Sequence, residues 1–223
     1  MGCRKIGRRE QQIASRQSLR AVRGRVAWRH AAIVLVVLCL LVLILRATGP
    51  ASFRHTPHPS RGMKSGYVSN LDPLVATDPG VSAGRWDYIV LHHSAADHGS
   101  AEIFDEAHRE RGWRGLGYHF VIGNGNGQGD GEITRGWRWA TQEAGAHSNS
   151  TEYNAHGIGI CLVGNFNAHP PTSAQIEAAG ALIAKLCRQH HIPPQNVLGH
   201  NQVRPTDCPG RLMPLEKLRA RAE

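Results

Sequence analysis

The stretch Asp87-Tyr-Ile-Val-Leu-His-His93 decides the fold class of this chain of 223 residues. Its first five residues are mostly β-branched, aromatic or aliphatic, and a short apolar run of this kind predicts a buried strand. A second run, His156-Gly-Ile-Gly-Ile-Cys-Leu-Val163, has the same character. Two such strands indicate a sheet whose faces are covered by other elements.

Shorter segments around these runs predict the rest of the sheet. Residues 117–122 and 132–135 have the composition of two hairpin strands, joined by a glycine-rich turn at 123–131. Residues 197–200 predict another short strand. No period is visible in residues 136–156, which we expect to form an irregular surface loop.

Helical patterns alternate with these strands. Ser100 is placed to cap a helix that runs through about Arg111. Thr172 and Gln175 have capping-box spacing at the start of a longer helix. Apolar residues recur in that helix at intervals of three and four, so it should lie on the sheet: Ile176, Ala179, Ile183, Leu186 and Cys187. A last helix is expected after Gly210, with three leucines turned inward: Leu212, Leu215 and Leu218.

This alternation predicts an α/β fold with a mixed central β-sheet flanked by helices, in a single domain over residues 85–223. The formal net charge of +9 does not belong to that domain. The first fifty residues contain ten basic side chains and one acidic one, whereas the remaining residues contain sixteen of each. The domain therefore has no excess positive charge, and we expect no nucleic-acid partner.

An uncharged apolar run extends from Ala31 to Leu45. As a helix it would be about 22 Å long, which is short of the roughly 30 Å hydrocarbon core. Trp28, Arg29 and Arg46 can extend it to the interfaces. We interpret residues 31–47 as an uncleaved transmembrane signal anchor. The alternatives are a cleaved signal peptide, although no clean small-residue cleavage site follows, and a buried core helix, although the run is apolar on every side.

The distribution of basic residues around this span predicts its orientation. More of them precede the span than follow it, so residues 1–30 should be a basic cytoplasmic tail. Residues 48–84 contain scattered proline, serine, threonine and glycine, which predicts a linker. The chain is thus expected to be a single-pass membrane protein with its folded domain outside the cytoplasm, in the periplasm or at the cell surface.

Three residues at or just beyond predicted strand ends are of metal-ligating types: His92, His200 and Cys208. Pro205 bends the chain between the last two, so both can point at one ion. Two imidazoles and a thiolate form a three-ligand zinc set that leaves a fourth position for water, as a hydrolytic site requires. Adjacent strand residues point to opposite faces, so only one of His92 and His93 should face this site, and periodicity does not say which.

Five groups of residues occur in an order that resembles a known family. They are Leu91-His-His-Ser-Ala95; Gly115-Leu-Gly-Tyr-His-Phe120; Gly145-Ala-His147; Gly157-Ile-Gly-Ile160 with Leu162-Val-Gly-Asn-Phe166; and Gly199-His200 with Thr206-Asp-Cys-Pro-Gly210. Together they resemble the zinc-dependent N-acetylmuramoyl-L-alanine amidase family, which includes phage lysozyme-type amidases and peptidoglycan recognition proteins. The resemblance covers roughly residues 85–215.

The resemblance implies Zn²⁺ as the cofactor, with His92, His200 and Cys208 as its ligands. It implies that Tyr118 is the catalytic tyrosine and that Thr206 occupies the family's second polar catalytic position. The reaction it implies is hydrolysis of the amide between N-acetylmuramic acid and the L-alanine of a peptidoglycan stem peptide. Peptidoglycan is then the partner of a monomeric catalytic domain.

Further residues are expected at the edge of this site or beneath it. The resemblance places His147 in the substrate groove, and we expect His93 and Asn165 to contact substrate as well. Cys161 and Cys187 should both face the core, strand against helix. In an oxidising compartment they could pair as a disulfide, and we expect two buried thiols instead.

One departure from the wider superfamily matters. One branch of the superfamily uses a glutamate as the base and an aspartate as the third metal ligand. This chain has Cys161 and Cys208 at those two positions, so we do not expect that branch's mechanism. The alternative functions are a non-catalytic peptidoglycan-binding module and an anchored scaffold whose tail recruits a partner. Recognition proteins without activity usually lack the cysteine ligand, and this sequence keeps it as Cys208, which favours catalysis.

Overall fold

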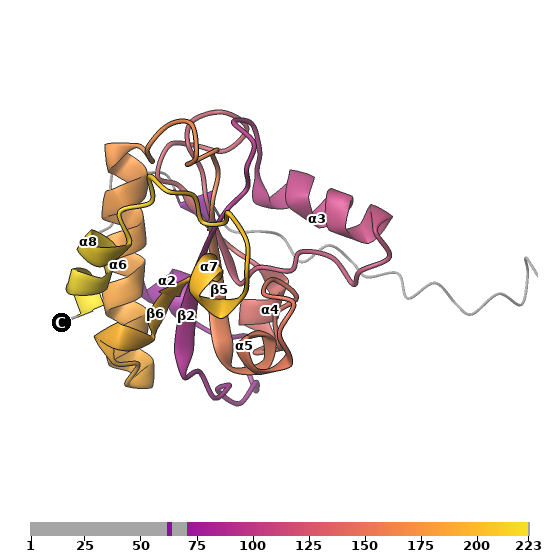
Figure 1. Cartoon of the computed structure of the whole chain (residues 1–223). Coiled ribbons are helices and arrows are strands. Elements are labelled where there is room, and N and C mark those ends of the chain that lie inside the picture. Colours follow the sequence, from indigo (N-terminus) through magenta and orange to yellow (C-terminus); the bar gives the residue numbers. More distant parts are fainter. Residues whose placement is uncertain (1–61, 64–70, 223) are drawn as a thin grey trace, which may run out of the picture. The chain divides into compact units, whose positions relative to one another are not determined.

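The computed structural model describes residues 62–63 and 71–222, and in this part of the chain six strands form one sheet. The strand order is β1-β4-β3-β5-β2-β6 (Figure 1). The β2–β5, β2–β6 and β3–β5 pairs are parallel, and the β1–β4 and β3–β4 pairs are antiparallel. The predicted mixed sheet is therefore confirmed. The strands are β1 (Gly62–Met63), β2 (Tyr88–His93), β3 (Phe120–Ile122), β4 (Ile133–Arg135), β5 (Gly157–Leu162) and β6 (Val197–Gly199).

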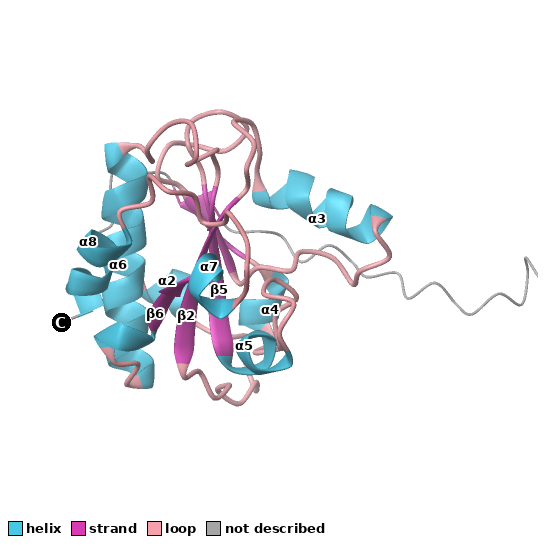
Figure 2. Ribbon diagram, in the orientation of Figure 1, coloured by secondary structure: helices cyan, strands magenta, loops and turns pink. Residues whose placement is uncertain are grey.

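Helices cover both faces of this sheet, as predicted. Figure 2 shows α6 and α8 on one side of the strands and α4 and α5 on the other. The helices are α2 (Asp72–Val75), α3 (Ala101–Glu110), α4 (Trp137–Ala140), α5 (Thr151–His156), α6 (Ser173–His190), α7 (His200–Val203) and α8 (Leu215–Arg219), with 3-10 turns η1 (Pro194–Asn196) and η2 (Ala220–Ala222).

The main core lies between the sheet and α6. Side chains alternate along a strand, and Ile89 and Leu91 of β2 pack in the same buried cluster as Leu182 and Leu186 of α6. His92 therefore points to the opposite face of β2, where its ring lies beside those of Tyr118, His147 and His200. The choice between His92 and His93 that periodicity left open is settled by this alternation.

The two predicted helix starts are confirmed. Ser100 caps α3, because its side chain accepts a hydrogen bond from the backbone N–H of Ile103 at 3.2 Å. Thr172 and Gln175 form a complete capping box at the start of α6, with distances of 3.0 and 3.1 Å. Each cap satisfies backbone donors that have no partner inside the helix.

The prediction of an irregular loop over residues 136–156 is wrong in part, because α4 and α5 lie in it. These helices have four and six residues, which is too short for a helical period to show. All four residues of α4 are also buried, so the helix has no polar face that would reveal its pattern. At the other end of the chain Leu218 is buried in α8 as expected, whereas Leu212 precedes that helix.

Ordered packing begins before residue 85, the expected start of the domain. Leu74 and Val75 of α2 are only 3% and 4% exposed and belong to the main core. Pro73 occupies the first turn of α2, where its missing N–H costs no hydrogen bond. A proline that suggested a linker thus starts a short helix that closes the core.

Most of the predicted N-terminal organisation lies outside the described residues. This applies to the tail at 1–30, the apolar span at 31–47 and the first part of the linker. Within the described residues, no helix is both long enough and apolar enough to cross a membrane.

Cys161 and Cys187 are both buried and both free. We expected both side chains to face the same core, and this expectation is wrong. Cys187 lies in α6 and belongs to the main core. Cys161 alternates along β5 with Ile160 and Leu162, which face that core, so its side chain points to the opposite face of the sheet. The sheet separates the two thiols.

Candidate metal centre

The topology of the sheet brings His92 and His200 together. β2 and β6 are parallel neighbours, and Leu91 pairs with Gly199. The residues that follow these two positions are His92 and His200, so the imidazoles leave the sheet at the same edge. The carboxyl ends of parallel strands are where α/β folds place their ligand sites.

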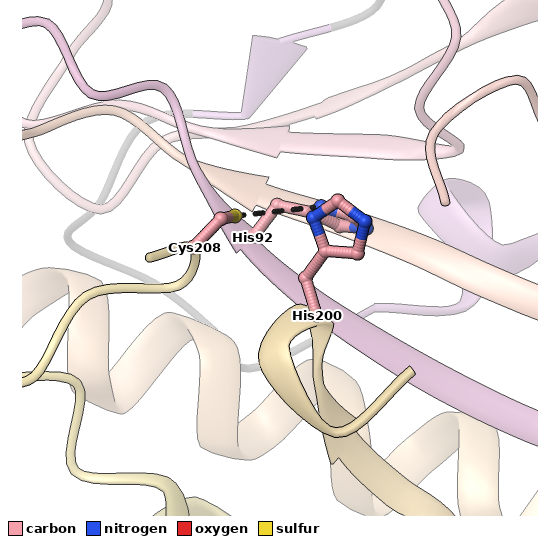
Figure 3. A group of neighbouring side chains, drawn as sticks. All are labelled: His92, His200 and Cys208. Atoms are coloured by element: carbon pink, nitrogen blue, oxygen red, sulfur yellow. Dashed lines mark hydrogen bonds between the residues drawn. The ribbon is translucent and has the colours of Figure 1, made fainter. Parts of the chain in front are cut away.

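Cys208 completes a group of three metal-type side chains. The chain turns after α7, and a ligand atom from each of His92, His200 and Cys208 lies within 4.8 Å of the other two. The Sγ atom of Cys208 is 3.6 Å from Nδ1 of His92 (Figure 3). The three predicted ligands therefore converge, from β2, from α7 and from the loop that follows it.

Hydrogen bonds on the far side of each ring orient the two histidines. Nε2 of His92 is 3.0 Å from Nδ1 of His147. Nε2 of His200 is 3.2 Å from the carbonyl oxygen of Ser148, to which it donates. The Nδ1 atom of His92 is left facing Cys208, and the Nδ1 atom of His200 keeps its lone pair because the ring proton is on Nε2.

Burial sets the charge state of the group. It lowers the pKa of His92 well below 6.5 and also lowers the pKa of His200, so both imidazoles are neutral at neutral pH. Burial raises the pKa of the Cys208 thiol to about 11, although the backbone N–H of His93 donates to its sulfur at 3.4 Å. Without a cation this thiol keeps its proton, and a bound divalent metal would displace it.

The types of ligand atom in this group indicate which metal it can bind. Two neutral imidazoles and one cysteine sulfur suit zinc, while a carboxylate, which calcium and magnesium prefer, is absent from the group. The sulfur accepts one hydrogen bond, from the backbone N–H of His93, and the Nε2 atoms of both imidazoles have partners elsewhere. The residues therefore fit a zinc ion held by three protein ligands.

Tyr118 lies beside this group, just before β3. Its ring centroid is 5.3 Å from that of His92. Burial raises the pKa of Tyr118 well above 10, and the neighbouring thiols of Cys161 and Cys208 raise it further. The phenol is therefore un-ionised at neutral pH and acts as a hydrogen-bond donor.

The remaining predicted residues have structural contacts. Thr206 is exposed, and its hydroxyl accepts a hydrogen bond from the N–H of Cys208 at 3.3 Å. His93 is buried, and its Nδ1 accepts from the N–H of Phe166 at 3.1 Å, so the ring holds the turn after β5. Asn165 accepts from the N–H two residues later within the same turn. Substrate contact by His93 and Asn165 stays a prediction.

His147 is buried behind the ligands, although the groove was expected to expose it. It is 9% exposed, and its Nε2 donates to the carbonyl oxygen of Gly157 at 3.2 Å while its Nδ1 faces His92. Burial lowers its pKa to about 4. The residue supports the ring of His92, and its contact with substrate stays a prediction.

Sequence reasoning missed three residues around the site. Ser148 and Asn154 lie in the segment that shows no period, and the hydrogen bonds they make cannot be read from periodicity. Cys161 was assigned to the wrong face, although its alternation with Ile160 and Leu162 carried the needed signal. Polar residues in loops commonly bond to nearby backbone, which is the only cue for Asn154.

Comparison with known proteins agrees with this geometry. A family model described as N-acetylmuramoyl-L-alanine amidase matches residues 82–211. Peptidoglycan-recognition protein SC2 of Drosophila melanogaster is 35% identical over 145 residues, which cover 60% of this chain and 74% of that protein. The N-acetylmuramoyl-L-alanine amidase of Homo sapiens is 37% identical over 108 residues, which cover 45% of this chain but 16% of that protein.

A solved structure gives the same result for the fold. N-acetylmuramoyl-L-alanine amidase LysC from Clostridium intestinale aligns with a TM-score of 0.56 and 34% identity, over 62% of this chain and 86% of that one. The family match spans more than half of the chain and contains all three candidate ligands together with Tyr118. The chain belongs to the N-acetylmuramoyl-L-alanine amidase family.

Proposed function

We propose that this domain is a zinc-dependent hydrolase. It cleaves the amide between N-acetylmuramic acid and the L-alanine of peptidoglycan stem peptides. The observation that carries the proposal is the convergence of His92, His200 and Cys208, with ligand atoms within 4.8 Å of one another, beside the un-ionised hydroxyl of Tyr118. A domain that only bound the cell wall would have no need for a metal-type group of this kind.

The three proposed ligands differ in whether they must lose a proton to bind zinc. His92 and His200 offer neutral nitrogens, so zinc binding requires no proton loss from them. Cys208 must lose its proton, and the backbone N–H of His93 stabilises the resulting thiolate. When bound, zinc supplies Lewis-acid stabilisation of a polarised carbonyl and lowers the pKa of water.

Tyr118 contributes a hydrogen bond where negative charge develops. Its hydroxyl group keeps its proton because burial disfavours the phenolate. A fixed donor of this kind stabilises the oxyanion of a tetrahedral intermediate more than it stabilises the ground-state carbonyl. Thr206 can only donate or accept hydrogen bonds at neutral pH. We assign it the second polar position of the site, at the turn that presents Cys208.

The cellular placement is also part of the proposal. The apolar run at 31–47 anchors the chain in a membrane, with residues 1–30 in the cytoplasm and the catalytic domain on the other side. Peptidoglycan lies on that outer side of the bacterial inner membrane. This arrangement would hold the enzyme close to its substrate.

A non-catalytic peptidoglycan-binding module is the second candidate. The observation in its favour is the similarity to a protein named for peptidoglycan recognition, at 35% identity. The two functions differ in their products, because a binding module sediments with the wall and releases nothing.

Product analysis separates the two candidates. The full chain, loaded with zinc, is incubated with isolated peptidoglycan, and the soluble products are examined by mass spectrometry. We expect free stem peptides that begin with L-alanine. Sedimentation of the protein with the wall, without any released peptide, would reject the hydrolase and favour the binding module.

A further inference from the structure

Both metal histidines are supported by the same short segment of chain. Nδ1 of His147 is 3.0 Å from Nε2 of His92, and the carbonyl oxygen of Ser148 is 3.2 Å from Nε2 of His200. These supporting residues are adjacent in the sequence, and each contacts the Nε2 atom of its ligand ring. We call residues 147–148 the brace.

The hydrogen bonds of the brace determine the tautomer of every ring in it. The carbonyl oxygen of Gly157 can only accept, so the proton of His147 lies on Nε2. Nδ1 of His147 then has a lone pair and accepts from Nε2–H of His92. The carbonyl oxygen of Ser148 likewise requires Nε2–H on His200. Both ligand rings are thereby left with unprotonated Nδ1 atoms.

One side chain holds the brace in place. Oδ1 of Asn154 accepts from the backbone N–H groups of His147 and Ser148, both at 3.0 Å. The hydroxyl of Ser148 lies 2.9 Å from the same oxygen and shares its one proton between Asn154 and the carbonyl oxygen of Ser150 at 3.1 Å. The two backbone donors from consecutive residues thus converge on a single amide oxygen, which fixes the position of the segment.

Two glycines make room for the ring of His147. A Cβ atom added to Gly145 or to Gly159 would overlap the Cδ2 atom of that ring. Neither glycine has a positive φ, so the backbone conformation alone does not require glycine at either position. The close approach of the imidazole is the physical reason for both residues.

We propose that the brace, fixed by Asn154, presets the tautomers and directions of both metal histidines, so that His147 and Asn154 are positioning residues for the metal centre. The inference rests on the proposed zinc site. Outer partners of this kind keep ligand rings oriented, and their loss typically weakens metal binding by about 10- to 100-fold. Here one segment serves two ligands at once.

The first test needs neither a variant nor activity. Long-range ¹H–¹⁵N correlation spectra of the metal-free full chain report which nitrogen of each histidine carries the proton. We expect Nε2–H for His92, His147 and His200. An Nδ1–H tautomer on His92 or His200 in the wild-type chain would overturn the proposal.

The second test measures zinc affinity by competition with a chromogenic chelator. His147→Leu removes the acceptor for His92 and should raise the zinc Kd by about 10- to 100-fold. His147→Asn places an amide oxygen near the position of Nδ1 and should recover most of that loss. Zinc affinity equal to wild type in a folded His147→Leu chain would contradict the proposal.

Asn154 and a distant histidine supply the matched comparisons. Asn154→Leu should weaken zinc binding, and Asn154→Asp should retain it because the accepting oxygen is kept. His191→Asn is the control, since this exposed residue at the end of α6 lies across the sheet from the site and its left-handed backbone suits asparagine. Equal losses of zinc affinity in Asn154→Leu and Asn154→Asp would reject the role of Asn154 in holding the brace.

The outcomes also separate this inference from the proposed function. A chain that binds zinc with the expected tautomers but cleaves no peptidoglycan would leave the brace intact and reject the hydrolase. A chain that cleaves peptidoglycan but has an Nδ1–H tautomer on His92 or His200 would support the hydrolase and reject the brace.

Discussion

At the scale of single residues, Tyr118 is the side chain whose chemistry is most open to test. Its hydroxyl group is un-ionised because burial raises its pKa, and its ring lies beside that of His92. We predict that Tyr118→Phe lowers kcat by about 10²- to 10³-fold, as expected for the loss of one oxyanion donor. Zinc affinity should stay unchanged, which a chelator competition assay measures. Unchanged kcat in Tyr118→Phe would remove the residue from the mechanism.

The site residues differ in how far sequence could predict them. His92, His200 and Cys208 were found because strand ends and a family resemblance pointed to the same positions. Substrate contact by His147 stays a prediction, and its contact with His92 could not be foreseen, since that contact spans 55 residues and depends on how a loop folds back. Asn154 carried no motif and acts through backbone amides, which no pattern of side chains reveals.

At the scale of elements, His119 ties β3 to β5. Its Nδ1 accepts from the N–H of Gly159 at 2.9 Å, and its Nε2 donates to the carbonyl oxygen of Glu143 at 3.1 Å. Burial lowers its pKa from 6.5 to about 3. The ring is therefore neutral in the folded chain over a pH range in which the unfolded chain binds a proton.

This difference predicts acid destabilisation with a defined sign. Between pH 6.5 and about 3 the unfolded state holds one proton more at His119, so the free energy of unfolding falls as the pH falls. The contribution is up to about 1.4 kcal/mol per pH unit. His119→Gln should show a shallower slope by one proton in denaturant titrations at several pH values. Parallel slopes would show that His119 titrates normally.

The capping box of α6 gives a second prediction at this scale. The hydroxyl of Thr172 accepts from the backbone N–H of Gln175, and the backbone N–H of Thr172 donates to the side-chain oxygen of Gln175. We predict that Thr172→Ala lowers the free energy of unfolding by about 1 kcal/mol. Thr172→Ser keeps the accepting oxygen and should lose less. Equal losses in the two variants would mean that the hydroxyl contributes nothing.

Element prediction succeeded where local signals were strong. The capping box and the repeat of apolar residues located α6, and apolar runs located β2 and β5. α4 and α5 were missed because helices of four and six residues form through tertiary contacts and leave no period in the sequence.

At the scale of the whole molecule, the start of the domain is the clearest difference from expectation. Leu74 is 3% exposed within the main core, although a linker was predicted there. We predict that Leu74→Ala lowers the free energy of unfolding by roughly 2 kcal/mol or more, as for other buried leucines. Ile103→Ala on α3, which is 39% exposed, is the comparison and should have a small effect. A similar small effect for Leu74→Ala would restore the linker interpretation.

The central claim is that His92, His200 and Cys208 hold one zinc ion that the amide hydrolysis requires. The most direct measurement is the rate of stem-peptide release from peptidoglycan by the metal-free full chain during titration with zinc, with Cys208→Ala alongside. We predict no stem-peptide release without zinc and the maximal rate of release at about one equivalent of zinc, because the three ligands surround a single ion. We predict no release by Cys208→Ala at any zinc concentration. Release that persists in excess chelator, or at the wild-type rate in Cys208→Ala, would contradict the account.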